Sequence, residues 1–223
     1  MFDLHYIQLR TIEELLFKKE ATFTQLNALN LTNDHFTFHI KQLIKRGLIE
    51  KVDDLYKLTS SGLELAGRLN TNKGTIYNQA KLSILVGIFR ENNGTLEVLL
   101  SKRKRDQSIG KIAWHTTKVD IGELLKDSAN RCLKNETGLT GNPEFAGVTH
   151  VIRKDENNYE IDVVLVDFLV LNPTGELITE TPDQTNFWIS YEDALKLDNT
   201  LVGMKEKLEA FKNRQITFNE YIN

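Results

Sequence analysis

The sequence predicts an α+β protein of two domains. Three observations support this class. Before residue 70 the apolar side chains recur at helical spacing, whereas beyond residue 79 long runs rich in Val, Ile and Leu are typical of strands. Between them, NTNKGTIYN is polar and has no periodicity. We therefore place a first domain at 1–70, a linker at 71–78 and a second domain, which ends in a helix, at 79–223.

The first domain is predicted to begin with three helices. Residues near helical spacing indicate a first helix of about four turns: Leu4, Ile7, Ile12, Leu15 and Leu16. A cap at Thr22 or Thr24 predicts a short helix at 25–29. Thr32 suits the N-cap of a third helix, which Gly47 ends. One face of that helix is apolar, with Phe36, Ile40, Leu43 and Ile44.

A hairpin and a fourth helix complete the first domain. Two short strands flank Asp53 and Asp54, and Ser60 begins a helix that reaches Leu69. This order, and the phrase HFTFHIKQLIKRGLIEKVDDLYKLTSSG, resemble the winged helix-turn-helix family. The matching residues are His39, Leu43, Gly47, Leu48, Ile49, Tyr56, Leu58, Thr59 and Gly62.

The resemblance implies that the third helix enters the major groove of DNA. The expected DNA contacts are Asn33, Thr37, Phe38, Lys41, Gln42 and Lys45 on the helix, and Lys51 and Lys57 on the wing. The balance of charge opposes this, because residues 1–70 hold nine Lys and Arg against nine Asp and Glu. Winged helices also bind proteins, so an interaction scaffold remains an alternative.

The second domain alternates strands and helices. KLSILVGIF and LEVLLSKR flank a turn with Asn-Gly at its centre, which predicts a hairpin. Helical spacing returns at 123–136, two further strands follow in EFAGVTHVIR and NYEIDVVLVDFLVL, and NFWISYEDALKL changes from strand to helix. A terminal helix is expected at 203–213.

The stretch GKIAWHTTKVDIGELLKDSANRCLKNETGLTG resembles the Nudix hydrolase family. The family pattern falls without a gap on Thr117, Glu123, Arg131, Cys132, Leu133, Asn135, Glu136, Gly138 and Leu139. The resemblance implies an α/β/α sandwich with a mixed sheet. It also implies hydrolysis of a diphosphate linkage with Mg²⁺ or Mn²⁺ held by carboxylates.

Three departures weaken that chemistry. Cys132 and Asn135 replace two glutamates of the metal-binding trio, and Thr117 replaces the glycine that opens the pattern. Soft sulfur is a poor ligand for Mg²⁺, and an amide brings no charge. Glu123, Arg131 and Glu136 remain, with Arg131 expected to orient Glu123 or Glu136. Any metal would rest on Glu136 and Glu123, and no spacing identifies a compensating acid among Asp120, Asp162, Asp167, Glu176 and Glu180.

These features lead to a hypothesis of function. The Nudix family includes regulators that pair such a domain with a winged helix, and the chain resembles them. A nucleotide-like or phosphorylated metabolite is expected near Arg103, Arg105, His115 and Glu136, where it would control DNA binding by a homodimer. The alternative is a divergent Nudix pyrophosphohydrolase that uses Mg²⁺ or Mn²⁺ on a nucleoside diphosphate derivative.

Bulk composition agrees with a globular cytoplasmic protein. Hydrophobic residues make up 40% and charged residues 26% of the chain, and the net charge of −3 provides no general attraction to nucleic acid or membrane. The lone cysteine, Cys132, cannot form an internal disulfide, which fits a reducing compartment. No signal peptide and no run of about 18 apolar residues is evident, so we expect no membrane partner.

Overall fold

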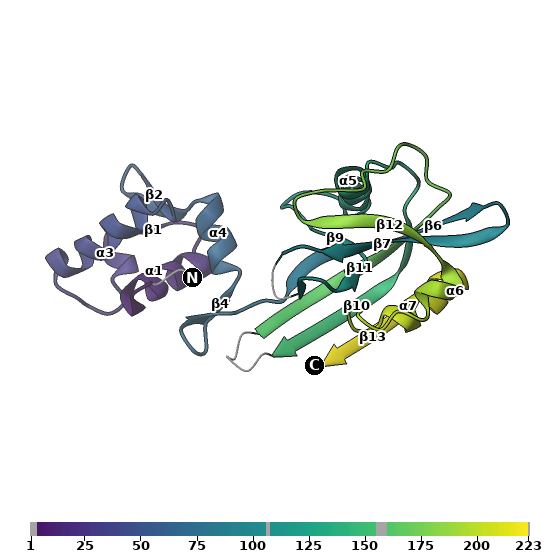
Figure 1. Cartoon of the computed structure of the whole chain (residues 1–223). Helices are drawn as coiled ribbons and strands as arrows, with labels where there is room; N and C mark the ends of the chain where they lie inside the picture. Colours follow the sequence, from purple (N-terminus) through teal and green to yellow (C-terminus); the bar gives the residue numbers. More distant parts are fainter. Residues whose placement is uncertain (1–3, 106–107, 155–159, 223) are drawn as a thin grey trace. The chain divides into compact units, whose positions relative to one another are not determined.

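Figure 1 shows the computed structural model, which describes residues 4–105, 108–154 and 160–222. The chain divides into two compact units, Met1–Gln79 and Ala80–Asn223. The predicted α+β class is confirmed, since an N-terminal unit of mainly helices precedes a unit built on a mixed sheet. None of the helices in the described ranges has the length and apolar character that a membrane crossing needs.

The first unit combines short helices with a small antiparallel sheet. Its helices are α1 (Tyr6–Phe17), α2 (Phe23–Leu26), α3 (Asn33–Lys45) and α4 (Ser60–Ala66). Its sheet has the order β1 (Ala21–Thr22), β3 (Leu55–Leu58), β2 (Ile49–Val52), so the hairpin expected around Asp53 and Asp54 is present.

Local sequence explains where these helices begin and end. The Thr22 hydroxyl accepts a hydrogen bond from the Gln25 backbone N–H, so α2 begins two residues before the predicted start at 25. Thr32 occupies the N-cap of α3 as predicted, although its side chain makes no capping bond. Gly47 adopts a φ of +67° beyond that helix, a conformation that favours glycine. The fourth helix ends at Ala66, short of the expected Leu69.

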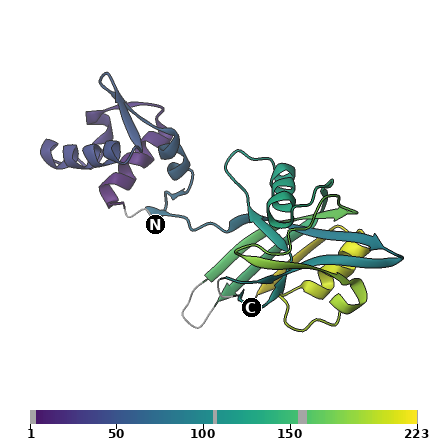
Figure 2. The same cartoon turned by 45° about the horizontal axis from the view of Figure 1, so that its top comes forward.

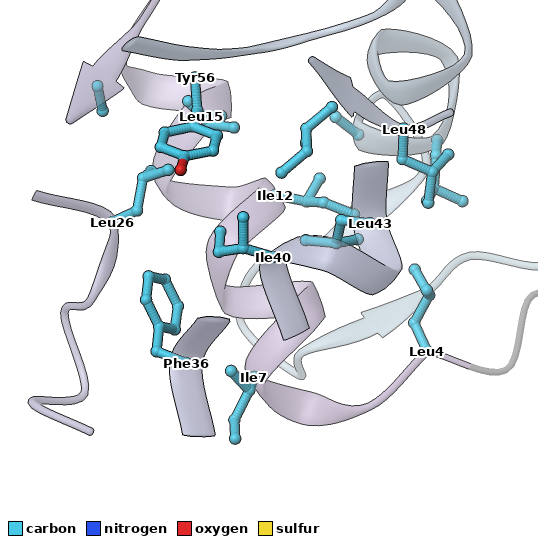
Figure 3. Close-up of a cluster of buried hydrophobic side chains, with 14 residues drawn as sticks. Leu4, Ile7, Ile12, Leu15, Leu26, Phe36, Ile40, Leu43, Leu48 and Tyr56 are labelled. Carbon is cyan, nitrogen blue, oxygen red and sulfur yellow. The ribbon is translucent and has the colours of Figure 1, made fainter. Parts of the chain in front are cut away.

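The core of the first unit lies between α1, α3 and the hairpin, as Figure 3 shows. Phe36, Ile40 and Leu43 of α3 point into it and are at most 3% exposed. The expectation that Ile44 shares this buried face is wrong, because Ile44 is 40% exposed. It follows Leu43 directly, and each helical residue rotates about 100° from the last. Leu16 of α1 is likewise 40% exposed.

The expected linker at 71–78 is partly ordered into strands. The strands β4 (Leu69–Asn70) and β5 (Thr75–Ile76) form an antiparallel pair. Ile76 packs against the core of the first unit. The segment that sequence reasoning treated as a polar connection therefore extends the first unit to residue 79.

A mixed sheet of eight strands forms the second unit. Along the sheet the order is β12 (Gln184–Ser190), β7 (Thr95–Arg103), β6 (Lys81–Asn92), β11 (Glu160–Leu171), β10 (Glu144–Lys154) and β13 (Thr217–Ile222). The short strands β8 (Ile112–Ala113) and β9 (His115–Lys118) pair with β7 and β6. β6 runs parallel to β11 and β10 parallel to β13, and the other pairs are antiparallel.

Helices cover both faces of this sheet. α5 (Leu125–Thr137) packs on one face through Ala129, Cys132 and Leu133. α6 (Tyr191–Ala194) and α7 (Met204–Lys212) cover the other face, as Figures 1 and 2 show. Successive residues of a strand point to opposite faces, so Ile84, Val86 and Ile88 of β6 meet α5 while Leu85 and Phe89 meet the α7 side.

Two details of this unit can be compared directly with the elements predicted from the sequence. The predicted hairpin joins β6 to β7, with Asn93 and Gly94 at φ of +50° and +77° in its turn. The strand β13 was not predicted, and it follows the expected terminal helix as an edge strand beside β10. Its alternation of exposed and half-buried residues is short, which makes it hard to separate from a polar tail.

Candidate functional site

The start of α5 is held by a partly exposed ionic network around Arg131. Arg131 Nε and Nη2 donate to Oε1 and Oε2 of Glu123, both at 2.7 Å. Ser128 donates its hydroxyl to the same carboxylate. The guanidinium also donates to Thr117 Oγ1 at 3.1 Å and to the Lys118 carbonyl at 2.8 Å. Arg131 therefore orients Glu123, not Glu136, and ties the 117–118 strand end to the helix.

Glu123 is committed to this network as a carboxylate. The hydrogen bond from Arg131, followed by that from Ser128, lowers the pKa of Glu123 to about 2. Both of its oxygens accept hydrogen bonds from the protein. These contacts give Glu123 a structural role and leave it poorly suited to the metal ligation considered from sequence.

The first acid position of the family pattern, directly after Arg131, is inaccessible. Cys132 is 1% exposed and packs in the apolar layer between α5 and the sheet. Burial raises the pKa of its thiol, so the side chain is neutral at physiological pH. Asn135 lies on the exposed side of the same helix. The two replaced positions thus offer a buried thiol and a neutral amide.

Glu136, near the end of α5, lies beside the predicted arginines. Its carboxylate accepts a hydrogen bond from Gln184 Nε2 at 3.2 Å. Burial and the nearby Asp183 raise the pKa of Glu136, while Arg105 and Arg103 oppose that rise. The structure therefore brings three of the four predicted ligand-binding residues together: Arg103, Arg105 and Glu136.

The fourth of these residues, His115, does not reach the surface. It is fully buried, and burial lowers its pKa to about 4. Asn186 Nδ2 donates to the carbonyls of Glu136 and Ile178, both at 2.7 Å, so its Oδ1 is the acceptor for His115 Nε2 at 3.0 Å. Direct ligand contact by His115 is thus contradicted by its burial, and the residue instead positions Asn186 beneath α5.

The metal that the resemblance implies does not fit this donor set. In the described ranges no three His, Cys, Asp or Glu side chains are grouped closely enough to hold an ion. The remaining acid, Glu136, lies in the field of two arginines. Hard divalent cations need several oxygen ligands with negative charge. We therefore derive no metal-dependent step from this site.

A cavity of about 590 Å³ opens on the other face of the sheet, the face that α7 partly covers. Its walls are apolar side chains of the sheet and the indole ring of Trp114. Basic side chains also line it: Lys81, Arg103, Lys111, Arg153 and Lys207. None of the described residues lining it is an Asp or a Glu. Such a cavity favours an anionic ligand with an apolar part.

The register of the strands places Lys81 at the outer end of the cavity. Lys81 lies in the same row as Val163 and Val151, near the end of the sheet. Ser83, Leu165 and Thr149 form the next row inward on the same face. Arg103, from the predicted ligand set, lines this cavity and also lies in the surroundings of Glu136.

The residues predicted to contact DNA lie on one solvent-facing side of α3. Asn33, Phe38, Lys41 and Lys45 are exposed, whereas Thr37 and Gln42 are partly exposed. The spacing of 33, 37, 41 and 45 repeats every four residues, which places them along one stripe of the helix. The geometry thus presents this set together, and what it binds remains a prediction.

The two lysines predicted on the hairpin have acidic neighbours. Lys51 Nζ lies 3.6 Å from Asp54 Oδ1, and Lys57 Nζ lies 3.3 Å from Glu50 Oε1. These exposed pairs reduce the positive field that the hairpin would offer to a phosphate backbone. The lysines of α3 therefore keep more of their positive charge for a partner than the lysines of the hairpin do.

Sequence reasoning missed the polar group at the inner end of the cavity. Asp167, Thr149 and Lys207 belong to β11, β10 and α7 and meet only in the folded chain. No spacing within one element links them. The available signal was Asp167 itself, a lone charge in the otherwise apolar strand segment VVLVDFLVL.

Comparisons with known proteins agree with this architecture. The family model described as NUDIX domain matches residues 81–211. The NUDIX domain of Shewanella oneidensis NrtR, solved with ADP ribose, is 17% identical over 70% of this chain and 99% of that chain, with a TM-score of 0.55. The MutT protein from Bacillus halodurans is 20% identical over 64% and 89% of the two chains, also with a TM-score of 0.55. No curated protein matches.

Proposed function

The chain belongs to the NUDIX domain family, whose model covers more than half of it, and from this premise we propose a function in regulation. The second unit binds a nucleotide-like or phosphorylated metabolite without hydrolysing it. The first unit binds DNA as a winged helix, and the metabolite changes the affinity of that binding. The protein acts as a homodimer, because paired half-sites are the usual target of such domains.

One observation carries this proposal: the cavity of the second unit is basic and apolar, and no described residue that lines it is acidic. A ligand with phosphates and a planar apolar part matches these walls. On the opposite face of the sheet, α5 carries Cys132 and Asn135 at two positions where the family pattern has acids. The second unit thus offers a cavity suited to an anionic ligand, while its α5 lacks two of the acids that metal chemistry needs.

A solved relative supports the class of ligand. The NUDIX domain of Shewanella oneidensis NrtR was solved with ADP ribose, a nucleotide that carries a diphosphate. At this level of identity the likeness establishes the fold alone. For this chain the ligand class follows from the cavity, and the relative makes a nucleotide with a diphosphate the first compound to test.

DNA binding by the first unit rests on the exposed stripe of α3. Lys41 and Lys45 make no ion pair among the described residues, so their charges are available to phosphates. Asn33 and Gln42 offer amide groups that can reach base edges. In this proposal the dimer adopts two arrangements that differ in their affinity for DNA. A ligand that binds one arrangement more tightly than the other shifts the population toward it.

The test measures both activities on the full chain. Fluorescence anisotropy with DNA from upstream of its own gene should show salt-dependent binding, and ADP ribose should change the affinity. Lys81→Glu should weaken ADP ribose binding, because it places a carboxylate in the cavity, whereas Lys205→Glu, on an exposed position outside the cavity, should not. The absence of DNA binding even at low salt would contradict the proposal.

A hydrolase remains the second candidate, and one observation favours it. Asp183, which pairs with Arg105 at 3.0 Å, brings a second negative charge to the surroundings of Glu136 and raises the pKa of Glu136. A cation between the two carboxylates would lower their repulsion. Hydrolysis of ADP ribose to AMP and ribose 5-phosphate with Mg²⁺ or Mn²⁺, lost in Glu136→Gln, would support this function over the regulator.

A further inference from the structure

The inner end of the cavity in the second unit holds a buried ion pair. Asp167 lies in the same row of the sheet as Leu85 and Gly147, four residues inward from the row that contains Lys81. Four residues of a strand span about 13 Å. A ligand that reaches both the outer Lys81 and this inner end must therefore be elongated.

Three side chains from different elements fix the geometry of this pair. Lys207 of α7 donates from Nζ to Asp167 Oδ2 of β11 and to Thr149 Oγ1 of β10. The Thr149 hydroxyl in turn donates to Asp167 Oδ2 at 2.8 Å. Thr149 and Lys207 line the cavity. A lysine ammonium has three N–H groups, so one remains beyond these two hydrogen bonds, and the Nζ also lies 5.6 Å from the centre of the Phe211 ring.

Stability alone does not call for this arrangement. Lys207 is 3% exposed and Asp167 is fully buried. Removing two charges from water costs much of what their attraction returns, and an apolar pair of similar volume is often as stable. A buried charge at the wall of a binding cavity is more readily understood as a recognition element.

We propose that Lys207 reads the enclosed end of the ligand by donating its third N–H to a carbonyl oxygen of an oxo-substituted nucleobase. This inference rests on the proposed metabolite-binding function. The base packs against the apolar walls and Trp114, while its phosphates lie toward Lys81 at the outer row. Guanine and uracil bear such a carbonyl. Adenine presents an amino group there, which cannot accept a hydrogen bond.

The ligand preference follows from the donor character of lysine. An ammonium only donates, so an amino group opposite it leaves two donors facing each other in a dry site. A hydrogen bond to a charged group is worth about tenfold in affinity or more. The cavity should therefore prefer GDP over ADP by about tenfold, although both carry the same diphosphate.

Isothermal titration of the full chain with GDP, ADP and inorganic pyrophosphate tests this preference. Lys207→Met alone would leave Asp167 buried without its partner, so the informative variant is Lys207→Met with Asp167→Leu, which removes both charges. We expect that double variant to bind GDP and ADP equally. Lys205→Met, on the same helix but outside the cavity, should keep the preference.

The outcomes separate two failures. Equal binding of GDP and ADP to the native chain, tighter binding of ADP, or a preference that persists in the double variant would each overturn the role of Lys207 while leaving metabolite binding intact. If GDP, ADP and pyrophosphate fail to bind and ADP ribose, titrated alongside them, also fails, the proposed metabolite-binding function fails, and the inference fails with it. Circular dichroism melting of each variant establishes that it is folded before titration.

Discussion

The helices α3 and α5 are alike in length and design but differ in what their polar residues contact. Each spans 13 residues and buries one face, α3 against the core of the first unit and α5 against the sheet of the second. On α5 the basic residues are engaged within the fold: Arg131 by Glu123, Lys126 by Asn142 and Lys134 by the Gly138 carbonyl. On α3 no described acid pairs with Lys41 or Lys45.

The difference teaches that a charged residue in a recognised pattern is not yet a site. Arg131 and Glu123 match the Nudix pattern, and in this chain they brace the helix against the preceding strand end. The lysines of α3 belong to a less specific pattern, yet they are the ones presented to solvent. Changes on the packed and hydrogen-bonded side of α5 should therefore alter folding stability, and changes on the exposed stripe of α3 should alter binding.

The largest expected effect comes from restoring an acid of the family pattern. Cys132→Glu should lower the free energy of unfolding by about 3 kcal/mol or more, because a carboxyl group at a 1% exposed position must lose its hydration. Urea unfolding followed by tryptophan fluorescence measures this. Both tryptophans, Trp114 and Trp188, belong to the second unit, so the signal reports that unit.

Asn135→Glu is the matched control for that change. It introduces the same acid three residues later, on the exposed side of the helix, and should change stability by less than about 0.5 kcal/mol. If both variants were equally stable, the face that carries Cys132 would have to open to solvent, and the contrast between the buried and exposed positions of α5 would be lost.

The second effect is a loss of folding stability when His115, which positions Asn186 beneath α5, becomes protonated. The pKa of His115 is lowered to about 4, so the folded chain keeps it neutral while the unfolded chain protonates it below about 6.5. Its contribution is complete above pH 6.5 and is lost as the pH falls from 6.5 to 4. The loss amounts to about 3 kcal/mol at most.

Unfolding by urea at several pH values, with the same fluorescence signal, measures that loss. His115→Gln keeps an amide near Asn186 but does not titrate, so its stability should vary less across the same window. Equal pH dependence in the native chain and the variant would show that His115 is protonated in the folded state, against its complete burial.

On α3 the expected effect is on DNA binding. Lys41→Ala with Lys45→Ala should reduce the slope of log affinity against log salt by about 2, since each lysine that leaves a phosphate removes about one released counterion. Stability should change by less than about 0.5 kcal/mol, because both side chains are exposed. Lys18→Ala with Lys19→Ala, on exposed positions after α1, removes the same charge and should leave the slope unchanged.

Much of the fold could be predicted from local pattern. The Asn-Gly turn, the apolar stripe of α3 and the spacing of the Nudix pattern each depend on neighbours in the chain, and each was found. The strand β13 and the pair β4 and β5 were missed because their pairing partners, not their own residues, make them strands.

The candidate site was less predictable for the same reason. Arg103, Arg105 and Glu136 were expected together, and in the fold β12 connects them, because Gln184 pairs with Arg103 and donates to Glu136. His115 was misjudged because a histidine in a loop sequence carries no signal of burial. The meeting of Lys207, Asp167 and Thr149 requires the sheet order and the packing of α7, neither of which one sequence reveals.

The smallest expected effect concerns the wing, where Lys57 lies 3.3 Å from Glu50. If this pair masks a lysine that faces DNA, Glu50→Gln should raise DNA affinity by up to about fivefold, the value of an exposed ion pair. Fluorescence anisotropy at fixed salt measures the gain. The control is Glu64→Gln, which removes an acid of α4 that pairs with Arg68. An unchanged affinity in Glu50→Gln would mean that the hairpin does not approach the phosphates, so that α3 alone supplies the contact. In that case the contrast between the helices would hold, but the first unit would bind DNA without a wing.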